Sequence, residues 1–316
     1  MTKKRFLLTG ILCSALLLGG CSALTNLNDE TEKEKEQKTD KKTEEERIED
    51  KYFVSVQDYT GEGYTLDNGE ETDRIAEENR DEVERAIKKY FKDEYKTEVK
   101  VHNIVGAIDG ATVFVESVGN PHFYSYAIIP IDKDKKEVDS EGVWSQEGQV
   151  ETAIVSGLYA WIFEKEFKEL NKFLENIAEE YPVIGINEEA NENVRGSYFL
   201  TPYYKVTVYG GLFKDLLPNY IQHPNWSRDD WQRLLDSKSL DASMTSITIQ
   251  MYMEKPDVDP DKKVFEEIVN KITEKDNIPA GNYSFILHDN TIDKTSAQNN
   301  KQNSLKKGAP NYIVKE

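Results

Sequence analysis

Cysteine is nearly absent from this chain of 316 residues, which contains only Cys13 and Cys21. Cys13 lies inside a short apolar run close to the N-terminus, and Cys21 follows that run. If the run is an export signal that is removed, Cys21 is the one cysteine of the mature chain. The folded part then has no disulfide bond, no cysteine nucleophile and no thiolate metal ligand, so an ordinary hydrophobic core must stabilise it.

Histidine is also scarce, and the four histidines stand in no local metal-binding pattern. None belongs to a His-Glu-x-x-His motif or lies beside a Cys-x-x-Cys pair. His288-Asp289 is a dipeptide that some phosphohydrolases use as metal ligands, but no partner ligands accompany it. The Gly-x-Ser-x-Gly motif of serine hydrolases is missing as well. We therefore expect no metal and no cofactor, and the sequence does not favour an enzyme.

Basic residues are few relative to acidic ones: 40 lysines and arginines face 59 aspartates and glutamates, for a formal net charge of −19. A nucleic-acid-binding surface must be basic, because its cations replace the counterions of the phosphates. The composition therefore argues against a nucleic-acid partner. The acidic excess keeps the protein soluble and away from anionic lipid headgroups; attraction of a cationic partner is the alternative explanation.

Long apolar runs are missing, and the N-terminal run extends only from Phe6 to Leu18. A membrane-spanning helix needs about 20 apolar residues, whereas this run is shorter and contains polar and small residues. Because a basic cluster at residues 3–5 precedes it, the run is typical of a cleaved signal peptide. An uncleaved transmembrane anchor is the alternative.

Two glycines separate this run from Cys21. The sequence Leu18-Gly19-Gly20-Cys21 resembles the lipobox of bacterial lipoproteins. The resemblance implies that a signal peptidase recognises Leu18, Gly19 and Gly20, that residues 1–20 are removed, and that Cys21 carries a diacylglyceryl group. Two acyl chains hold a protein stably at a membrane. We therefore expect a lipid-anchored protein on the extracytoplasmic face of the cell membrane.

Residues 21–50 are rich in Glu and Lys and have few apolar side chains to bury. Such a composition is typical of a disordered segment; a solvated helix held by Glu–Lys pairs is the alternative. In either form the segment is a tether between the lipid and the folded part.

The periodicity of residues 51–290 predicts one domain of the α+β class. Three strands between about 99 and 131 form an antiparallel meander, and Asp109-Gly110 is typical of a two-residue hairpin turn. The helical stretches at 72–91 and 149–181 are long and amphipathic, and we expect them to pack against the meander.

The C-terminal part of this domain is predicted to be a strand, a helix and a strand between residues 244 and 288. Two lobes that meet near residue 182 are the alternative to one domain. From Asp289 the sequence turns polar and basic, so residues 291–316 are predicted to be a flexible tail.

Aromatic residues make up 10% of the chain and gather in three places. These clusters are residues 122–126, residues 198–209, and Trp226 with Trp231. Aromatic residues on strands usually pack in cores, but a ligand groove is the alternative. The candidate ligand-binding residues are Tyr64, His122, Tyr124, His288 and Asp289.

Four runs of the sequence resemble a family of Gram-positive lipoproteins that is known as a domain of unknown function, DUF1672. The runs are Asp58–Tyr64, Tyr95–Asn103, Ser145–Val150 and Leu287–Asn290. The resemblance covers nearly the whole mature chain and implies a lipid anchor, but it implies no activity and no catalytic residues.

Three hypotheses about function follow. The first is a non-enzymatic surface lipoprotein that binds a protein or small-molecule partner, which requires an apolar or aromatic patch with a polar rim. The second is a solute-binding or transport-assisting lipoprotein, which requires a deep cleft. The third is a hydrolase of envelope material centred on His122 or His288, which requires titratable groups that converge in a pocket.

The variant Cys21→Ala is expected to abolish incorporation of labelled fatty acid, because the acceptor thiol is lost. Labelling of cells that express the protein measures this. Cys13→Ala is the matched control and should keep the label, since Cys13 leaves with the signal peptide. Label retained by Cys21→Ala would refute the lipid anchor.

Overall fold

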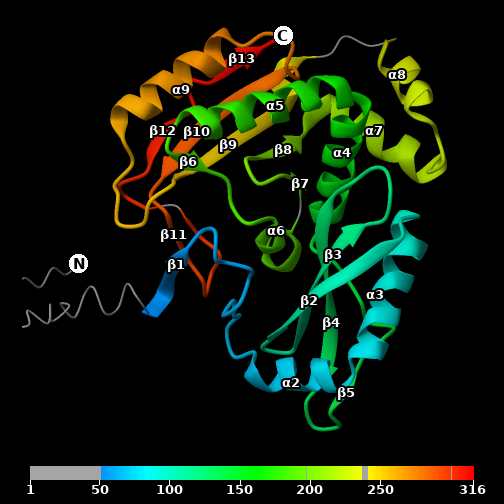
Figure 1. Cartoon of the computed structure of the whole chain (residues 1–316). Helices are drawn as coiled ribbons and strands as arrows, with labels where there is room; N and C mark the ends of the chain where they lie inside the picture. Colours follow the sequence, from blue (N-terminus) through cyan, green and yellow to red (C-terminus); the bar gives the residue numbers. More distant parts are fainter. Residues whose placement is uncertain (1–50, 197, 237–240, 300) are drawn as a thin grey trace, which may run out of the picture. The chain divides into compact units, whose positions relative to one another are not determined.

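The computed structural model describes residues 51–196, 198–236, 241–299 and 301–316. Helices and largely antiparallel sheets are mixed along the chain, so the predicted α+β class is confirmed. Figure 1 shows a four-stranded sheet in the lower half of the view and a larger sheet in the upper half.

The four-stranded sheet is the predicted meander, with the order β2-β3-β4-β5 and antiparallel neighbours. Its strands are β2 (Val99–Ala107), β3 (Gly110–Ser117), β4 (Tyr124–Asp132) and β5 (Glu137–Val138). Side chains alternate between its two faces, as in any strand. On β3, Val113 and Val115 are fully buried in the main core, whereas Phe114 and Glu116 point to the opposite face. The sheet therefore has one aliphatic face and one aromatic and polar face.

Two helices, α2 (Glu70–Glu78) and α3 (Arg80–Tyr95), pack on this sheet and bury their apolar sides in the same core as Val113. The sequence predicts one helix over 72–91, and the structure interrupts it at Asn79. The side chain of Asn79 donates to the carbonyl oxygen of Ile75 at 2.9 Å. Such local side-chain bonds compete with the helical backbone, which explains the break.

The larger sheet contains seven strands among the described residues, with the central order β12-β10-β9-β8-β7. Strand β6 pairs with β9, and β13 pairs with β10. The strands are β6 (Val183–Ile184), β7 (Phe199–Leu200), β8 (Tyr204–Val208), β9 (Thr245–Met253), β10 (Gly281–His288), β12 (Leu305–Lys307) and β13 (Ile313–Lys315). Strands β9 and β10 run parallel, with α9 (Lys262–Glu274) between them in the chain. This is the predicted strand–helix–strand unit.

The helical stretch 149–181 forms α4 (Gln149–Ile162) and α5 (Glu164–Glu180), which meet at Phe163. Helix α4 is buried along most of its length and contacts both β4 and β8. One hydrophobic cluster therefore includes side chains of both sheets, and the described residues belong to a single compact unit. The structure has no division into two lobes near residue 182 within this unit.

The remaining helices connect and flank the strands of the larger sheet. They are α6 (Glu188–Val194), α7 (Gly210–Gln222) and α8 (Arg228–Asp236), with a short 3₁₀ helix at Ala242–Met244. Helix α6 lies against β2 and β3 of the meander. It also packs into a second, smaller core with Tyr59, Tyr252 and Ile292.

The prediction of a flexible tail over 291–316 is wrong. Strand β11 (Thr291–Asp293) pairs with β1 (Phe53–Ser55), and both β12 and β13 pair with β10. These strands are difficult to recognise in the sequence, because the segment is polar and each strand has only three residues. Ile292 and Ile313 are buried in the two cores, and they hold the segment in place.

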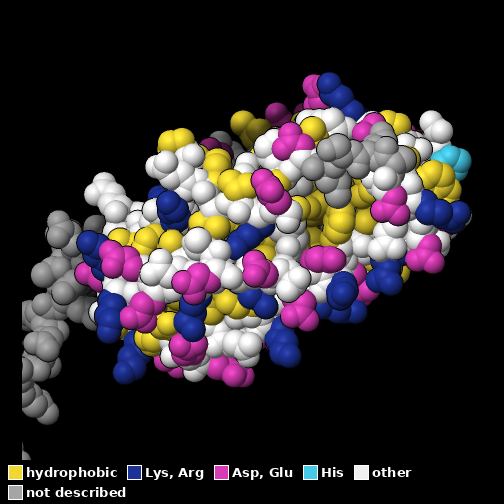
Figure 2. All heavy atoms as spheres, turned by 90° about the horizontal axis from the view of Figure 1, so that it is seen from above, with side chains coloured by type: hydrophobic (Ala, Val, Ile, Leu, Met, Phe, Trp, Pro, Cys, Tyr) yellow, Lys and Arg dark blue, Asp and Glu magenta, His cyan; other side chains and the backbone are white. Residues whose placement is uncertain are grey.

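No helix among the described residues has the length and apolar character that a membrane span requires. Figure 2 shows one face of the molecule, on which acidic and basic side chains are interspersed and hydrophobic side chains lie between them. This face carries charges of both signs.

The variant Ile292→Ala is expected to lower the free energy of unfolding by about 2–4 kcal/mol, because it leaves a cavity under a fully buried side chain. Val314→Ala is the matched control in the same segment. Its side chain is 56% exposed, so the change should stay within about 0.5 kcal/mol. Urea denaturation measures both, and equal, negligible effects would support a loose tail instead.

Candidate functional site

A cleft of about 620 Å³ lies beside the aromatic and polar face of the meander. Strands β3 and β4 supply one wall, with Phe114 and Tyr126. The segment after α6 and strand β8 supply another wall, and Tyr64 reaches in from the loop before α2. The cleft therefore combines segments that are far apart in the sequence.

Aromatic side chains form much of the cleft surface. The rings of Tyr64 and Phe114 meet edge to face, with centroids 5.9 Å apart, and the ring centroid of Tyr126 also lies 5.9 Å from that of Phe114. Burial raises the pKa of Tyr64 and of Tyr126 above the ordinary value. Both phenols are thus neutral at physiological pH and offer ring surface and hydroxyl groups.

Two cations, Arg195 and Lys205, line the same cleft. Arg195 donates hydrogen bonds to the amide oxygens of Asn191 and Gln250 at 3.3 and 3.5 Å. The Nζ atom of Lys205 lies 5.1 Å from the ring centroid of Tyr198. Burial, and next the charge of Arg195, lower the pKa of Lys205.

Neither cation is paired with an acidic group among the residues that the structure describes. Within the described part of the chain, no carboxylate oxygen lies within 4 Å of a charged nitrogen of Arg195 or Lys205. The described lining contains no Asp, Glu or His at all. In a chain with a net charge of −19, this cleft is a local concentration of positive charge.

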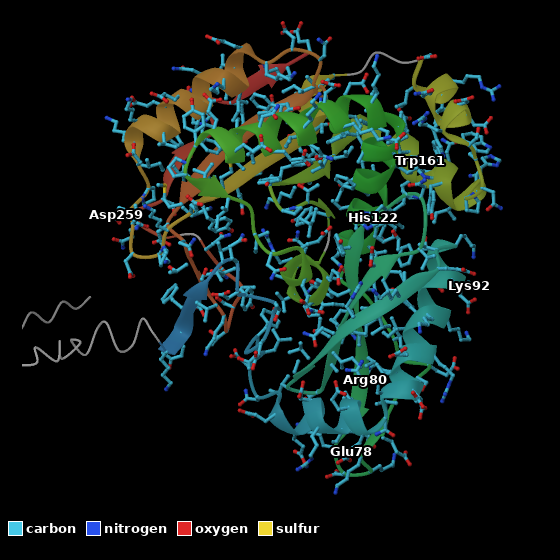
Figure 3. The ribbon with its side chains drawn as sticks, viewed as in Figure 1. Glu78, Arg80, Lys92, His122, Trp161 and Asp259 are labelled. Carbon is cyan, nitrogen blue, oxygen red and sulfur yellow. The ribbon has the colours of Figure 1, made fainter. Side chains whose placement is uncertain are left out.

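A second group of polar side chains lies on the same face of the meander but outside the cleft lining. This histidine–glutamate cluster consists of His102, Glu116, His122 and Glu192. Nε2 of His102 lies 2.8 Å from one oxygen of Glu116, and Nε2 of His122 lies 2.9 Å from the other. Nδ1 of His102 lies 3.3 Å from Glu192. Figure 3 labels His122 between the two sheets.

A bulge in β2 directs His102 and its neighbour toward α6. The pairing of β2 with β3 shifts register between Val101 and Ile104, so two successive side chains oppose one residue of β3. His102 reaches Glu192 of α6, and Asn103 donates to the carbonyl oxygen of Asn193 at 3.1 Å.

The cluster affects the pKa of Glu116 and of the neighbouring Tyr124. Burial raises the pKa of Glu116, but hydrogen bonds from His122 and His102 outweigh it and hold that pKa below its ordinary value. Burial, and next the charge of Glu116, raise the pKa of Tyr124, whose ring centroid lies 5.1 Å from that of His122.

Comparison with known proteins assigns the chain to a family. The family described as "Protein of unknown function (DUF1672)" matches residues 45–315. This chain is a member of the DUF1672 family. The solved structure of a DUF1672 family protein from Staphylococcus aureus subsp. aureus Mu50 has the same fold, with a TM-score of 0.71 and 19% sequence identity. The match covers 84% of this chain and 98% of that one. No curated protein matches the sequence.

The His288-Asp289 pair of this DUF1672 protein does not converge on one site. His288 is buried, stacks on Tyr252 with ring centroids 5.1 Å apart, and bonds through Nδ1 to Ser304 at 2.9 Å. Asp289 lines a separate surface cleft and pairs with Lys301 at 2.8 Å. Asp259 lines that surface cleft too, and Figure 3 shows it far from His122.

The structure therefore places the candidate ligand-binding residues of this DUF1672 protein at different sites. Tyr64 lines the aromatic cleft, whereas His122 and Tyr124 belong to the histidine–glutamate cluster or lie beside it. Residues Leu18, Gly19, Gly20 and Cys21 lie outside the described residues.

The sequence analysis missed the cations of the cleft and every member of the cluster except His122. Arg195 and Lys205 come from a segment whose pattern is irregular, and His102 and Glu192 are 90 residues apart. One usable indication existed, because strict alternation on β3 places Phe114 and Glu116 on the face opposite to Val113 and Val115.

The burial of His288 predicts a pH dependence of stability. Burial lowers its pKa to about 4, below the value of 6.5 expected in the unfolded chain. Between these values the unfolded chain binds a proton that the folded chain does not. The free energy of unfolding should therefore fall by about 2 kcal/mol from this group between pH 7 and pH 4.5.

Urea denaturation of the wild type and of His288→Gln at both pH values measures this effect. The glutamine cannot be protonated, so the variant should lose less stability on acidification. Identical losses in the two proteins would contradict a buried neutral histidine.

Proposed function

We propose that this DUF1672 protein is a membrane-anchored, non-enzymatic binding protein that holds a small anionic ligand with a flat apolar part. The observation that carries the proposal is the pair Arg195 and Lys205 in an aromatic cleft of an acidic protein, where the described residues offer neither cation an acidic partner.

The chemistry of the cleft fits such a ligand. A guanidinium group binds carboxylate, phosphate or sulfonate oxygens through parallel hydrogen bonds, and a lysine adds a point charge. The rings of Tyr64, Phe114 and Tyr126 offer surfaces for a flat apolar group. A volume of about 620 Å³ lies within the range of small-molecule sites.

Electrostatics also favour an anion here. Partly buried charges without a counter-ion are costly, and a bound anion would offset that cost. Because the described lining has no carboxylate, nothing in it repels an anion at short range.

The lipobox-like sequence at Cys21 supports a place for this binding domain at the cell membrane, with residues 21–50 as the tether. The transport-assisting alternative uses the same cleft and differs only in what happens to the ligand. The hydrolase alternative has less support, because His288 is buried against Tyr252 and His122 lies outside the cleft, whose described lining contains no histidine or carboxylate to act as acid or base.

A pair of fluorescent probes tests the proposal. 8-Anilinonaphthalene-1-sulfonate carries an aromatic system and one negative charge, and N-phenyl-1-naphthylamine is its neutral analogue. The native protein should bind the sulfonate more tightly than the amine. Arg195→Gln and Lys205→Met should each weaken sulfonate binding about 10-fold or more, since each removes a charge-assisted contact. Their affinity for the amine should change less than about 3-fold.

Lys92→Met is the matched control, because Lys92 is exposed on α3 and the variant has the same net charge as Lys205→Met. It should bind both probes as the wild type does. Circular dichroism and thermal melting establish that each variant is folded. Sulfonate binding that is equal in all folded variants would refute the anion site.

A further inference from the structure

The histidine–glutamate cluster is a second site, separate from the aromatic cleft and not required by the proposed binding function. We infer that His102, Glu116 and His122 bind a divalent transition metal ion of the zinc class, and that Glu192 orients His102.

The donor set suits such an ion. Two imidazoles and one carboxylate, with a water molecule in the fourth position, are a common set of zinc ligands. Nε2 of His102 and Nε2 of His122 already lie 2.8 and 2.9 Å from the oxygens of Glu116. Ligand atoms that bind zinc at about 2.0–2.2 Å are about 3.4 Å apart in a tetrahedral site. The two histidines thus flank the carboxylate of Glu116, and the 36% exposed His122 has to turn toward His102 to complete the set, since the atoms within 4.8 Å of one another belong to His102, Glu116 and Glu192.

Glu192 has the position of an outer-shell carboxylate. Histidines that bind a metal usually donate their other ring N–H to a carboxylate or carbonyl group, which fixes the ring. Nδ1 of His102 lies 3.3 Å from Glu192 while Nε2 faces Glu116. One donor atom each of His102, Glu116 and Glu192 lies within 4.8 Å of the others. The bond from Asn103 to the backbone of α6 holds this helix against the bulge.

The charge of the cluster also favours a cation. Glu116 and Glu192 are two carboxylates, and across the described ranges no Lys or Arg nitrogen lies within 4 Å of either one. A divalent ion would balance them.

Exposure permits an ion to enter. The side chain of His102 is only 6% exposed, whereas that of His122 is 36% exposed. His102 and Glu116 lie on neighbouring strands, and His122 lies in the turn that precedes β4. Two ligands are thus held by the sheet, and the third lies on the solvent side, where water can occupy the open position.

Calorimetric titration of Zn²⁺ into the metal-free full chain, without an affinity tag, tests the inference. One equivalent should bind with a dissociation constant well below that of the exposed carboxylates. Glu116→Gln and His122→Ala should each weaken this binding 100-fold or more. Glu192→Gln should weaken it 10- to 100-fold, as expected for an outer-shell group. X-ray absorption at the zinc edge should show imidazole and oxygen ligands at about 2.0–2.2 Å.

Glu189→Gln is the matched control, because Glu189 is exposed on the same helix as Glu192 and loses the same charge. It should leave zinc affinity unchanged. If Glu116→Gln fails to fold, the exposed His122→Ala decides the question. Weak zinc binding that all folded variants share would overturn the inference and leave the cluster as histidines that contact the two glutamates.

Discussion

The close approach of helix α4 to the turn at His122 is the contact on which the rest of the structure depends. A Cβ atom at Gly157 would lie 2.3 Å from the carbonyl oxygen of His122, so only glycine permits this packing. The approach brings α4 into contact with β4, while other residues of the same helix contact β8. One buried helix thereby joins the aliphatic face of the meander and the larger sheet into a single core.

This shared core leaves the aromatic and polar face of the meander available for binding. The cleft forms beside this face, and α6 with its following segment contributes to both candidate sites. Glu192 of this helix contacts His102, and Arg195, three residues later, lines the cleft. The chain as a whole is acidic, whereas the described lining of the cleft has no acidic residue, so the two cations give the cleft a charge opposite to that of the protein.

Regular patterns made part of this architecture predictable. The Asp109-Gly110 turn and the alternation of β3 predict the meander, and the apolar half of the 149–181 stretch predicts a buried helix. The breaks at Asn79 and Phe163 were not predictable, because apolar periodicity continues across them. The strands after residue 290 were missed because three-residue strands have too few positions to show alternation.

The candidate sites were less predictable than the fold, for a physical reason. His122 was found because it lies in a local cluster of aromatic residues, and Tyr64 ends one of the runs that resemble the DUF1672 family. Arg195 and Lys205 can be recognised as part of a binding site only when tertiary packing brings them beside Phe114. His102 can be recognised as part of a cluster only when it lies beside Glu192. Spacing along the sequence does not show which residues come into contact across sheets and helices.

The most direct test of an anion-binding cleft is a crystal structure of the protein grown with 4-bromobenzenesulfonate, with data collected at the bromine absorption edge. The account predicts an anomalous peak between the rings of Tyr64, Phe114 and Tyr126, with the sulfonate beside Arg195 and Lys205. A cleft without the compound at a concentration that saturates binding, or peaks found only elsewhere on the surface, would contradict it.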